Sequence, residues 1–284
     1  MKSYKKISFI ILVIVLVISI FLIILFSQYS RNVKVVFLDV GQGDAILIQA
    51  PGNIDVLIDG GPDKKVLSGL GKHLPFWDRK IELVILTHPH TDHLQGLIEV
   101  LKSYKVERII DSQIDYTGAD YQDWLRVTQE KKIPLEKTVN GDRFNLGENT
   151  YLKTLYPLTD ITGQKFENLN DTSIVTELID GSYSFLFTGD SRAEEEKEML
   201  AADLISGVEV LKVGHHGSKY SSSPPFLTQL SPSYAVFQVG KNNRFGHPHL
   251  ITLQRLEKIG ARIFRTDTDG EVICERKKAL LTCY

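Results

Sequence analysis

The feature that most constrains this chain is a cluster of three histidines and one aspartate within residues 88–93. A short apolar run precedes the cluster and apolar residues at helical spacing follow it, which predicts a buried strand that gives way to a helix. Side chains alternate in an extended segment, so His88 and His90 point to the same side and can bind one metal ion. Entry into the helix turns Asp92 and His93 toward a neighbouring point. One loop can therefore serve two metal ions.

The alternative is a histidine-rich surface loop in which Asp92 caps the following helix. The whole chain has eight histidines, and three of them lie in this hexapeptide. Histidine and aspartate gathered at the end of a strand are typical of metal sites, so we favour the metal interpretation.

The amino terminus predicts a separate element. Residues 7–26 are apolar apart from two serines, and lysines precede them. About 20 helical residues at a rise of ~1.5 Å span about 30 Å, the thickness of the hydrocarbon core of a bilayer. We therefore predict a cytoplasmic basic segment at 1–6, a single transmembrane anchor at 7–26, a linker at 27–32 and one extracytoplasmic domain at 33–284. Secretion after cleavage of a signal peptide is the alternative, but the apolar run is long and no clear cleavage site follows it.

Composition limits the other possibilities. The formal charge of −2 excludes a strong attraction to nucleic acid or membrane through net charge alone. The 43% of hydrophobic residues provide ample core material for a globular domain. Cys274 and Cys283 do not have a metal-binding spacing, and both a disulfide and two free thiols remain open.

Polar side chains recur just after the predicted strands of the domain. They are Asp59, the 88–93 cluster, Asp190, the pair His215 and His216, and His247. Loops at one edge of an α/β sheet converge on a common crevice, so these side chains are expected to meet. The pattern predicts one α/β domain with a site assembled from five loops.

The motifs resemble those of a known family. Residues 87–93 resemble the His-x-His-x-Asp-His signature of the metallo-β-lactamase superfamily, and further motifs resemble the soluble hydrolase domain of ComEC-type DNA-uptake proteins. These further motifs, in chain order, are at 37–45, 141–146, 170–175, 187–190, 211–218 and 245–248. The resemblance implies an α/β (α+β) fold, namely a four-layer αββα sandwich, and two divalent metal ions, Zn²⁺ or Mn²⁺.

The resemblance also implies roles for individual residues. His88 and His90 would bind one ion, and Asp92 and His93 would bind the other. Asp190 would bridge the two ions, and we choose His215 over His216 to complete the second site because it is nearer the strand end.

The first site departs from the family pattern. The superfamily usually has a further histidine in a middle loop, where this chain has Asn170 and Asp171. The first site is therefore expected to be weaker, more open or suited to a harder ion than zinc. Asp59 is expected to brace the histidines, while Asn170, Asp171, His216 and Lys219 are expected to support the site or contact the substrate.

The expected catalytic residues are Asp92, Asp190 and His247. His247 would contact the scissile group or protonate the leaving oxygen, although a structural role is the alternative. The cationic residues beside the motifs favour an anionic substrate, although scattered surface charges would look the same; they are Lys212, Lys219, Lys241 and Arg244.

We therefore expect a membrane-anchored, extracytoplasmic, metal-dependent phosphodiesterase or nuclease, with DNA as one candidate substrate and no obligate protein partner. The alternatives are an esterase for envelope phosphodiesters such as phosphorylcholine or teichoic acid, a lactonase or β-lactamase, and a non-catalytic binding module. The sequence does not choose between zinc and manganese, nor does it give the oligomeric state.

Overall fold

Two mixed β-sheets form the centre of the molecule in the computed structural model, which describes residues 2–29, 32–277 and 280–284. The first sheet has the strand order β17-β16-β1-β2-β3-β5-β7-β8. Its strands are β1 (Lys34–Phe37), β2 (Ile46–Ala50), β3 (Ile54–Ile58), β5 (Leu83–Ile85), β7 (Ile109–Ile110), β8 (Leu135–Glu136), β16 (Val272–Lys277) and β17 (Leu280–Cys283). The short strands β4 (Lys80–Ile81) and β6 (Lys105–Val106) pair separately.

The second sheet has the order β15-β14-β13-β12-β11-β10-β9. Its strands are β9 (Arg143–Gly147), β10 (Thr150–Tyr156), β11 (Val175–Asp180), β12 (Tyr183–Phe187), β13 (Val210–Lys212), β14 (Tyr234–Phe237) and β15 (Arg262–Arg265). The helices are α1 (Lys2–Tyr29), α2 (Lys65–His73), α3 (Thr91–Ser103), α4 (Ala119–Glu130), α5 (Ala193–Ala201), α6 (Pro224–Leu230), α7 (Leu250–Lys258) and α8 (Thr266–Asp269). Short 3₁₀ turns are η1 (Pro51–Asn53), η2 (Leu169–Thr172) and η3 (Gly214–Gly217).

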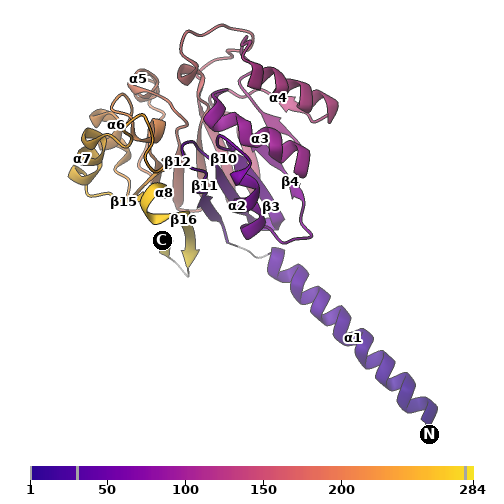
Figure 1. The fold of residues 1–284 in the computed structure, drawn as a ribbon. Helices are drawn as coiled ribbons and strands as arrows, with labels where there is room; N and C mark the ends of the chain where they lie inside the picture. The colour runs from indigo at the N-terminus through magenta and orange to yellow at the C-terminus, as the bar shows by residue number, and fades with distance from the viewer. Residues whose placement is uncertain (1, 30–31, 278–279) are drawn as a thin grey trace.

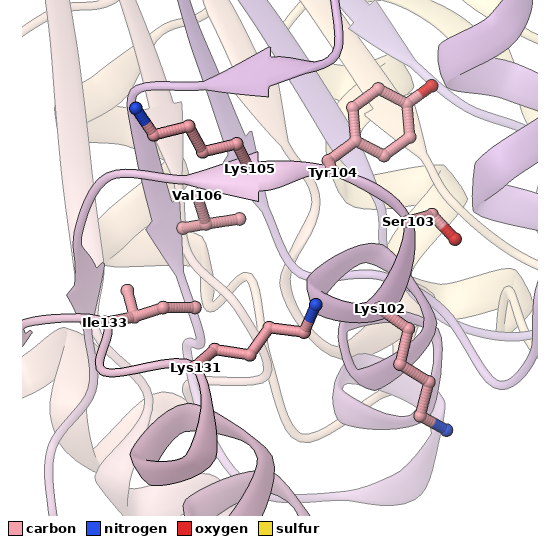
Figure 2. A pocket seen from close by; sticks show the side chains of 7 residues that line it. All are labelled: Lys102, Ser103, Tyr104, Lys105, Val106, Lys131 and Ile133. Carbon is pink, nitrogen blue, oxygen red and sulfur yellow. The ribbon is translucent and has the colours of Figure 1, made fainter.

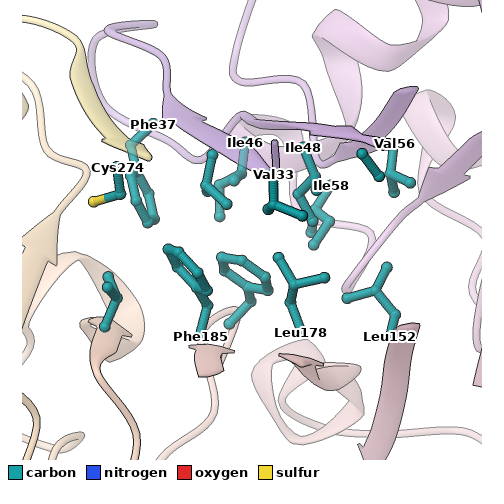
Figure 3. Close-up of a cluster of buried hydrophobic side chains, with 14 of the residues drawn as sticks. Val33, Phe37, Ile46, Ile48, Val56, Ile58, Leu152, Leu178, Phe185 and Cys274 are labelled. Atoms are coloured by element: carbon teal, nitrogen blue, oxygen red, sulfur yellow. The ribbon is translucent and has the colours of Figure 1, made fainter. Parts of the chain in front are cut away.

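Three apolar clusters define four layers. One lies between the sheets, where Phe37 and Ile48 of the first sheet face Leu178 and Phe185 of the second (Figure 3). A second cluster joins the first sheet to α2, α3 and α4, and a third joins the second sheet to α5, α6 and α7 (Figure 1). The predicted αββα sandwich is therefore confirmed.

Alternation along each strand explains this layering. In β2, Ile46 and Ile48 face the other sheet, whereas Leu47 between them faces the helices. Side chains of successive strand residues point to opposite faces, so a strand with apolar residues on both faces is covered on both sides. The central strands read as continuous apolar runs for this reason.

Parallel pairing brings the predicted polar loops to one edge. In the first sheet β3, β5 and β7 are parallel neighbours, and in the second sheet β12, β13 and β14 are parallel neighbours. Asp59 and the 88–93 cluster follow β3 and β5, while Asp190 and the two adjacent histidines follow β12 and β13. The carboxyl ends of parallel strands meet at one edge of a sheet. Both sheets therefore present their loops to a common crevice.

The amino-terminal helix α1 extends away from the sandwich (Figure 1). Within the part of the chain that the structure describes, no helix has the length and apolarity needed to cross a bilayer. Residue 1 of the predicted basic segment and residues 30–31 of the predicted linker lie outside the described residues. The membrane anchor at 7–26 stays a prediction.

The two cysteines form a disulfide. Cys274 in β16 and Cys283 in β17 are register partners in an antiparallel hairpin, and their sulfur atoms are bonded. Both are buried against the core between the sheets. The choice that the sequence left open is therefore decided in favour of the disulfide.

Two glycines set the position of α3. The backbone N–H of Gly60 donates to the His93 carbonyl at 2.7 Å, and that of Gly96 donates to the Gly61 carbonyl at 2.9 Å. A Cβ at Gly96 would lie 1.8 Å from the Gly60 carbonyl oxygen. Helix and strand end therefore touch backbone to backbone, which places His93 beside Asp59.

Replacing Gly96 with alanine is expected to lower the free energy of unfolding by about 1–3 kcal/mol, because the backbones must separate. The matched control is Gly71→Ala in α2, where an added Cβ meets nothing within 4 Å and a gain of about 0.5–1 kcal/mol is expected. Chemical denaturation measures both. Equal stability of the two variants would contradict the close packing of α3.

Candidate metal centre

The predicted histidines and aspartates gather in one buried cluster at the shared edge of the two sheets. Four overlapping groups each place three potential ligand atoms within 4.8 Å of one another. Their members are His88, His93 and Asp190; Asp92, His93 and His216; Asp44, Asp59 and His93; and Asp44, Asp190 and His216. The site thus combines residues from both halves of the chain.

One half of the cluster is built by His88 and His90. The Nδ1 atom of His88 lies 3.1 Å from the Thr87 hydroxyl, which itself donates to Asp59 at 2.7 Å, so His88 donates from Nδ1 and leaves Nε2 as an acceptor. This Nε2 lies 3.0 Å from Nδ1 of His90 and 3.9 Å from an Asp190 oxygen. Two ring nitrogens at this separation need a shared proton or cation between or beside them.

The other half begins with His93. Its Nδ1 donates to the Asp59 carboxylate at 2.7 Å, which fixes the ring and leaves Nε2 as the free nitrogen. This Nε2 is buried, has no hydrogen-bond partner among the described residues, and lies 3.4 Å from Asp190. Asp59 thus braces the histidine as the sequence predicted.

His216 is oriented in the same way. Its Nδ1 donates to the Gln238 carbonyl oxygen at 2.9 Å. Its Nε2 lies 3.3 Å from Asp92 and 3.4 Å from Asp190, and it too is buried without a partner in the described part of the chain. Buried polar atoms are normally hydrogen-bonded, so unpartnered nitrogens that face carboxylates fit a metal ion.

The choice of His215 over His216 is not supported by this geometry. His215 is partly exposed, and its Nε2 lies 3.7 Å from Asp190 on the side of Asn170. Both histidines have positive φ, 48° and 52°, so the chain turns sharply after β13. The turn directs the second histidine, not the first, to the side of Asp92. The geometry therefore favours His216 as the ligand on the side of Asp92.

Asp190 occupies the centre of the cluster. Its carboxylate lies within 4 Å of a ring nitrogen of each of His88, His93, His215 and His216. Burial would raise its pKa, but the neighbouring histidines His216 and His93 hold the pKa well below its ordinary value. A carboxylate so placed has the position that a bridging ligand needs.

Two charged residues of the cluster were not assigned to it from the sequence. Asp44, from the glycine-rich turn before β2, lies 3.3 Å from Nδ1 of His216. Lys212 is fully buried, where its ammonium contacts the Asp44 carboxylate and donates to the Gly189 carbonyl oxygen at 2.9 Å. Burial alone would lower the pKa of Lys212, but the carboxylates of Asp44 and Asp190 outweigh burial and raise it.

The expectation that Lys212 attracts the substrate is therefore wrong, because its ammonium is buried and its charge is neutralised by the Asp44 carboxylate. The position of Asp44 in the Gly-Gln-Gly-Asp motif was the available signal for its role. Nothing in the sequence around Lys212 distinguishes it from a surface lysine.

The negative charge of these carboxylates raises the pKa values of two histidines of the cluster, His93 and His216. Burial would lower the pKa of His216, but Asp190 and Asp44 raise it to about 10. Burial likewise opposes the raised pKa of His93, which Asp190 and Asp59 produce. A cation is favoured strongly at both rings. A divalent ion bound there would take the place of the protons.

The remaining predicted residues lie around the cluster. Asn170 contacts the first half, and its side-chain oxygen is buried without a partner in the described structure. Asp171 instead forms an ion pair with Arg192 at 2.6 Å. Lys219 is exposed, with its ammonium 5.1 Å from the Tyr220 ring centroid.

His247 lies beside the cluster rather than in it. Its ring centroid is 5.6 Å from that of His215 and 6.3 Å from that of His216. Burial and the neighbouring histidines lower its pKa to about 4, so the ring is neutral at pH 7.

Two depressions on the surface contain basic side chains. One, of about 470 Å³, opens beside Asp92 and is lined by the 243–245 loop. The other, of about 440 Å³, contains Lys102, Lys105 and Lys131 and none of the predicted site residues (Figure 2). It lies where α3 and α4 end, and lysines there neutralise the negative ends of the helix dipoles. The second depression therefore has a structural explanation.

Comparison with known proteins identifies the family to which this chain is similar. The chain matches the Metallo-beta-lactamase superfamily over residues 38–241. It is 31% identical over 269 residues to ComE operon protein 3 of Bacillus subtilis, covering 89% of this chain and 34% of that protein. It is 32% identical over 258 residues to Recombination protein 2 of Haemophilus influenzae, covering 89% of this chain and 30% of that protein. The chain spans about a third of the length of these relatives.

The fold agrees with a solved structure. The metallo-beta-lactamase fold protein YhfI from Bacillus subtilis has a TM-score of 0.56 at 13% identity, covering 89% of this chain and 100% of that chain. Likeness at this level of identity concerns the arrangement of strands and helices alone.

The metal content of two variants should show which of the two adjacent histidines, His215 or His216, binds metal. His216→Ala is expected to reduce the Zn²⁺ or Mn²⁺ retained after desalting, because it removes a buried ring nitrogen that faces Asp92 and Asp190. His215→Ala is the matched control and should retain most of the metal. Elemental analysis of both purified variants measures the metal that each retains. A larger loss in His215→Ala would restore the original assignment.

Metal affinity is expected to rise with pH between 6 and 8. The pKa of His216 is raised to about 10 and that of His93 is raised well above its ordinary value, so binding must displace protons and becomes easier as the pH increases. Competition with a chromophoric chelator at several pH values measures the slope. An affinity independent of pH would show that these rings carry no proton to displace.

Proposed function

Because this chain belongs to the metallo-β-lactamase superfamily of hydrolases and is related to competence proteins, we propose that it is a metal-dependent phosphodiesterase that cleaves nucleic acid. The observation that carries the proposal is the set of unpartnered ring nitrogens of His93 and His216 arranged around Asp190. Such a donor set, with histidine and carboxylate but no cysteine, suits Zn²⁺ or Mn²⁺.

The residues divide into two ligand groups in this proposal. His88, His90 and Asp190 would hold one ion, and Asp92, His93, His216 and Asp190 the other. Two such ions would lower the pKa of a bound water and stabilise charge on a phosphoryl group. Asp59 and the Gln238 carbonyl hold His93 and His216 in the orientation that leaves Nε2 free.

The chain itself shapes the remaining chemistry. Since the pKa of His247 is lowered to about 4, its ring is neutral at pH 7 and cannot serve as a store of protons. We assign it to hydrogen bonding with the bound phosphodiester rather than to protonation of the leaving oxygen. Asn170 replaces the usual histidine beside the first group, which leaves that side open for a substrate oxygen.

Several observations favour a nucleic-acid phosphodiester. Arg244 lines the depression that opens beside Asp92, and Lys219 and Lys241 are exposed. The related proteins carry names that refer to competence and recombination. The reacting group of a lactam or lactone is neutral, whereas a phosphodiester carries a negative charge that cations at the mouth of the site attract.

We also propose that the enzyme acts outside the cytoplasm, held by its amino-terminal helix. The Cys274–Cys283 disulfide supports this location, because disulfides persist in oxidising compartments. The basic residues before the apolar run at 7–26 support the orientation.

The direct test is hydrolysis by the 284-residue chain, purified in detergent and loaded with Mn²⁺ or Zn²⁺. Single- and double-stranded DNA should be cleaved, a chelator should abolish cleavage, and Asp190→Ala should lower the rate by roughly a hundredfold or more. Asp160→Ala removes an exposed carboxylate that pairs with Lys137 and serves as the matched control.

The other substrates decide among the alternatives. Turnover of phosphorylcholine diesters or teichoic acid without DNA cleavage would assign an envelope esterase, and opening of a chromogenic lactam would assign a lactamase. A metal-loaded protein that turns over none of these would be a binding module.

A further inference from the structure

We propose that the depression beside Asp92 is a nucleobase subsite, in which the base next to the scissile phosphate stacks on Arg244 and Phe245. This inference rests on the proposed phosphodiesterase function and specifies its substrate class. The depression has a volume of about 470 Å³ and reaches from Asp92 to the exposed end of the 243–245 loop. A group bound there is therefore adjacent to a proposed metal ligand.

One aromatic ring and one guanidinium group, those of Phe245 and Arg244, line the depression. Phe245 is 49% exposed and lines the depression. The guanidinium carbon of Arg244 lies 5.0 Å from the Phe245 ring centroid. On the cluster side, the His247 ring lies 5.8 Å from Phe245 with an interplanar angle of 25°. Bases stack on aromatic rings and on guanidinium planes, and this wall offers both.

The loop that carries the wall is held in place before any ligand binds. The Asn243 side chain donates to the Gly240 carbonyl at 3.0 Å and to the His247 carbonyl at 2.6 Å, and it accepts from the His247 N–H at 3.0 Å. A side chain that closes its own loop in this way lowers the entropy lost on binding.

A polar group with an unused donor lines the same depression. The side-chain oxygen of Gln42 accepts from the Gly240 N–H at 3.2 Å, which fixes the orientation of the amide. Its Nε2 is buried and has no hydrogen-bond partner in the described residues. A carbonyl oxygen or ring nitrogen of a base is an acceptor that would satisfy it.

The positive charge of Arg244 argues against a choline group as the ligand of this depression. Quaternary ammonium groups bind in aromatic cages, but Arg244 already places a permanent positive charge against Phe245. The same charge attracts the phosphates on either side of a base. Stacking surface, free donor and positive charge together fit a nucleotide and not a choline ester.

The test compares two diesters with the same leaving group, thymidine 5′-(p-nitrophenyl phosphate) and methyl p-nitrophenyl phosphate, on the metal-loaded 284-residue chain. The measured quantity is the ratio of kcat/KM for the nucleoside ester to that for the methyl ester. Phe245→Leu keeps an apolar side chain but removes the flat face, and it should lower this ratio roughly tenfold. Phe245→Trp should preserve the ratio or raise it.

Phe76→Leu is the matched control, because Phe76 is an equally large ring that is 83% exposed and does not line the depression. It should leave the ratio unchanged. An equal loss with both esters in Phe245→Leu, or a wild-type protein without preference for the nucleoside ester, would overturn the subsite.

A binding measurement separates this inference from the proposed function. Calorimetric titration of the metal-loaded protein with thymidine 5′-monophosphate and with methyl phosphate needs no turnover. The subsite predicts that the nucleotide binds about tenfold more tightly, and that Phe245→Leu removes the difference. If neither diester is hydrolysed, the phosphodiesterase proposal fails while this titration still decides. Equal affinities for the two ligands would refute the subsite itself.

Discussion

The contact between Lys212 and Asp44 is the interaction on which the rest of the site depends. Lys212 ends β13 of the second sheet and Asp44 precedes β2 of the first, so their ion pair joins the two sheets at the edge where the loops meet. Asp59 and Asp190 are buried close by, and three buried carboxylates would repel one another without an internal cation. The lysine, together with the rings of His93 and His216, whose pKa values these carboxylates raise, makes a dense anionic cluster compatible with a folded core.

Local spacing allowed part of the site to be predicted. His88 and Asp92 lie within one hexapeptide at a strand-to-helix junction, so their relative positions follow from two regular elements. The apolar runs also predicted the central strands, because strands covered on both faces contain few polar residues. In contrast, the choice between His215 and His216 depended on two positive φ angles in a short turn, which residue types alone do not specify.

Contacts across the sandwich could not be predicted from the sequence, for a different reason. Lys212 looks like any lysine near a glycine-rich loop, and its burial follows only from the approach of a turn about 170 positions earlier in the chain. The disulfide was undecided because its formation depends on the hairpin register that opposes Cys274 to Cys283. Long-range pairing decided each of these cases.

The place of β1 in the first sheet has a consequence for how the protein is made. β1 lies between β2, which follows it directly, and β16, which is more than 230 residues further along the chain. Val272 and Cys274 of β16 also fill the layer between the sheets. While the chain is being synthesised, one edge of β1 and part of that apolar layer must stay uncovered until β16 and β17 emerge. The nascent domain therefore carries an exposed strand edge for most of its synthesis, and its closure is a late event set by its last strands.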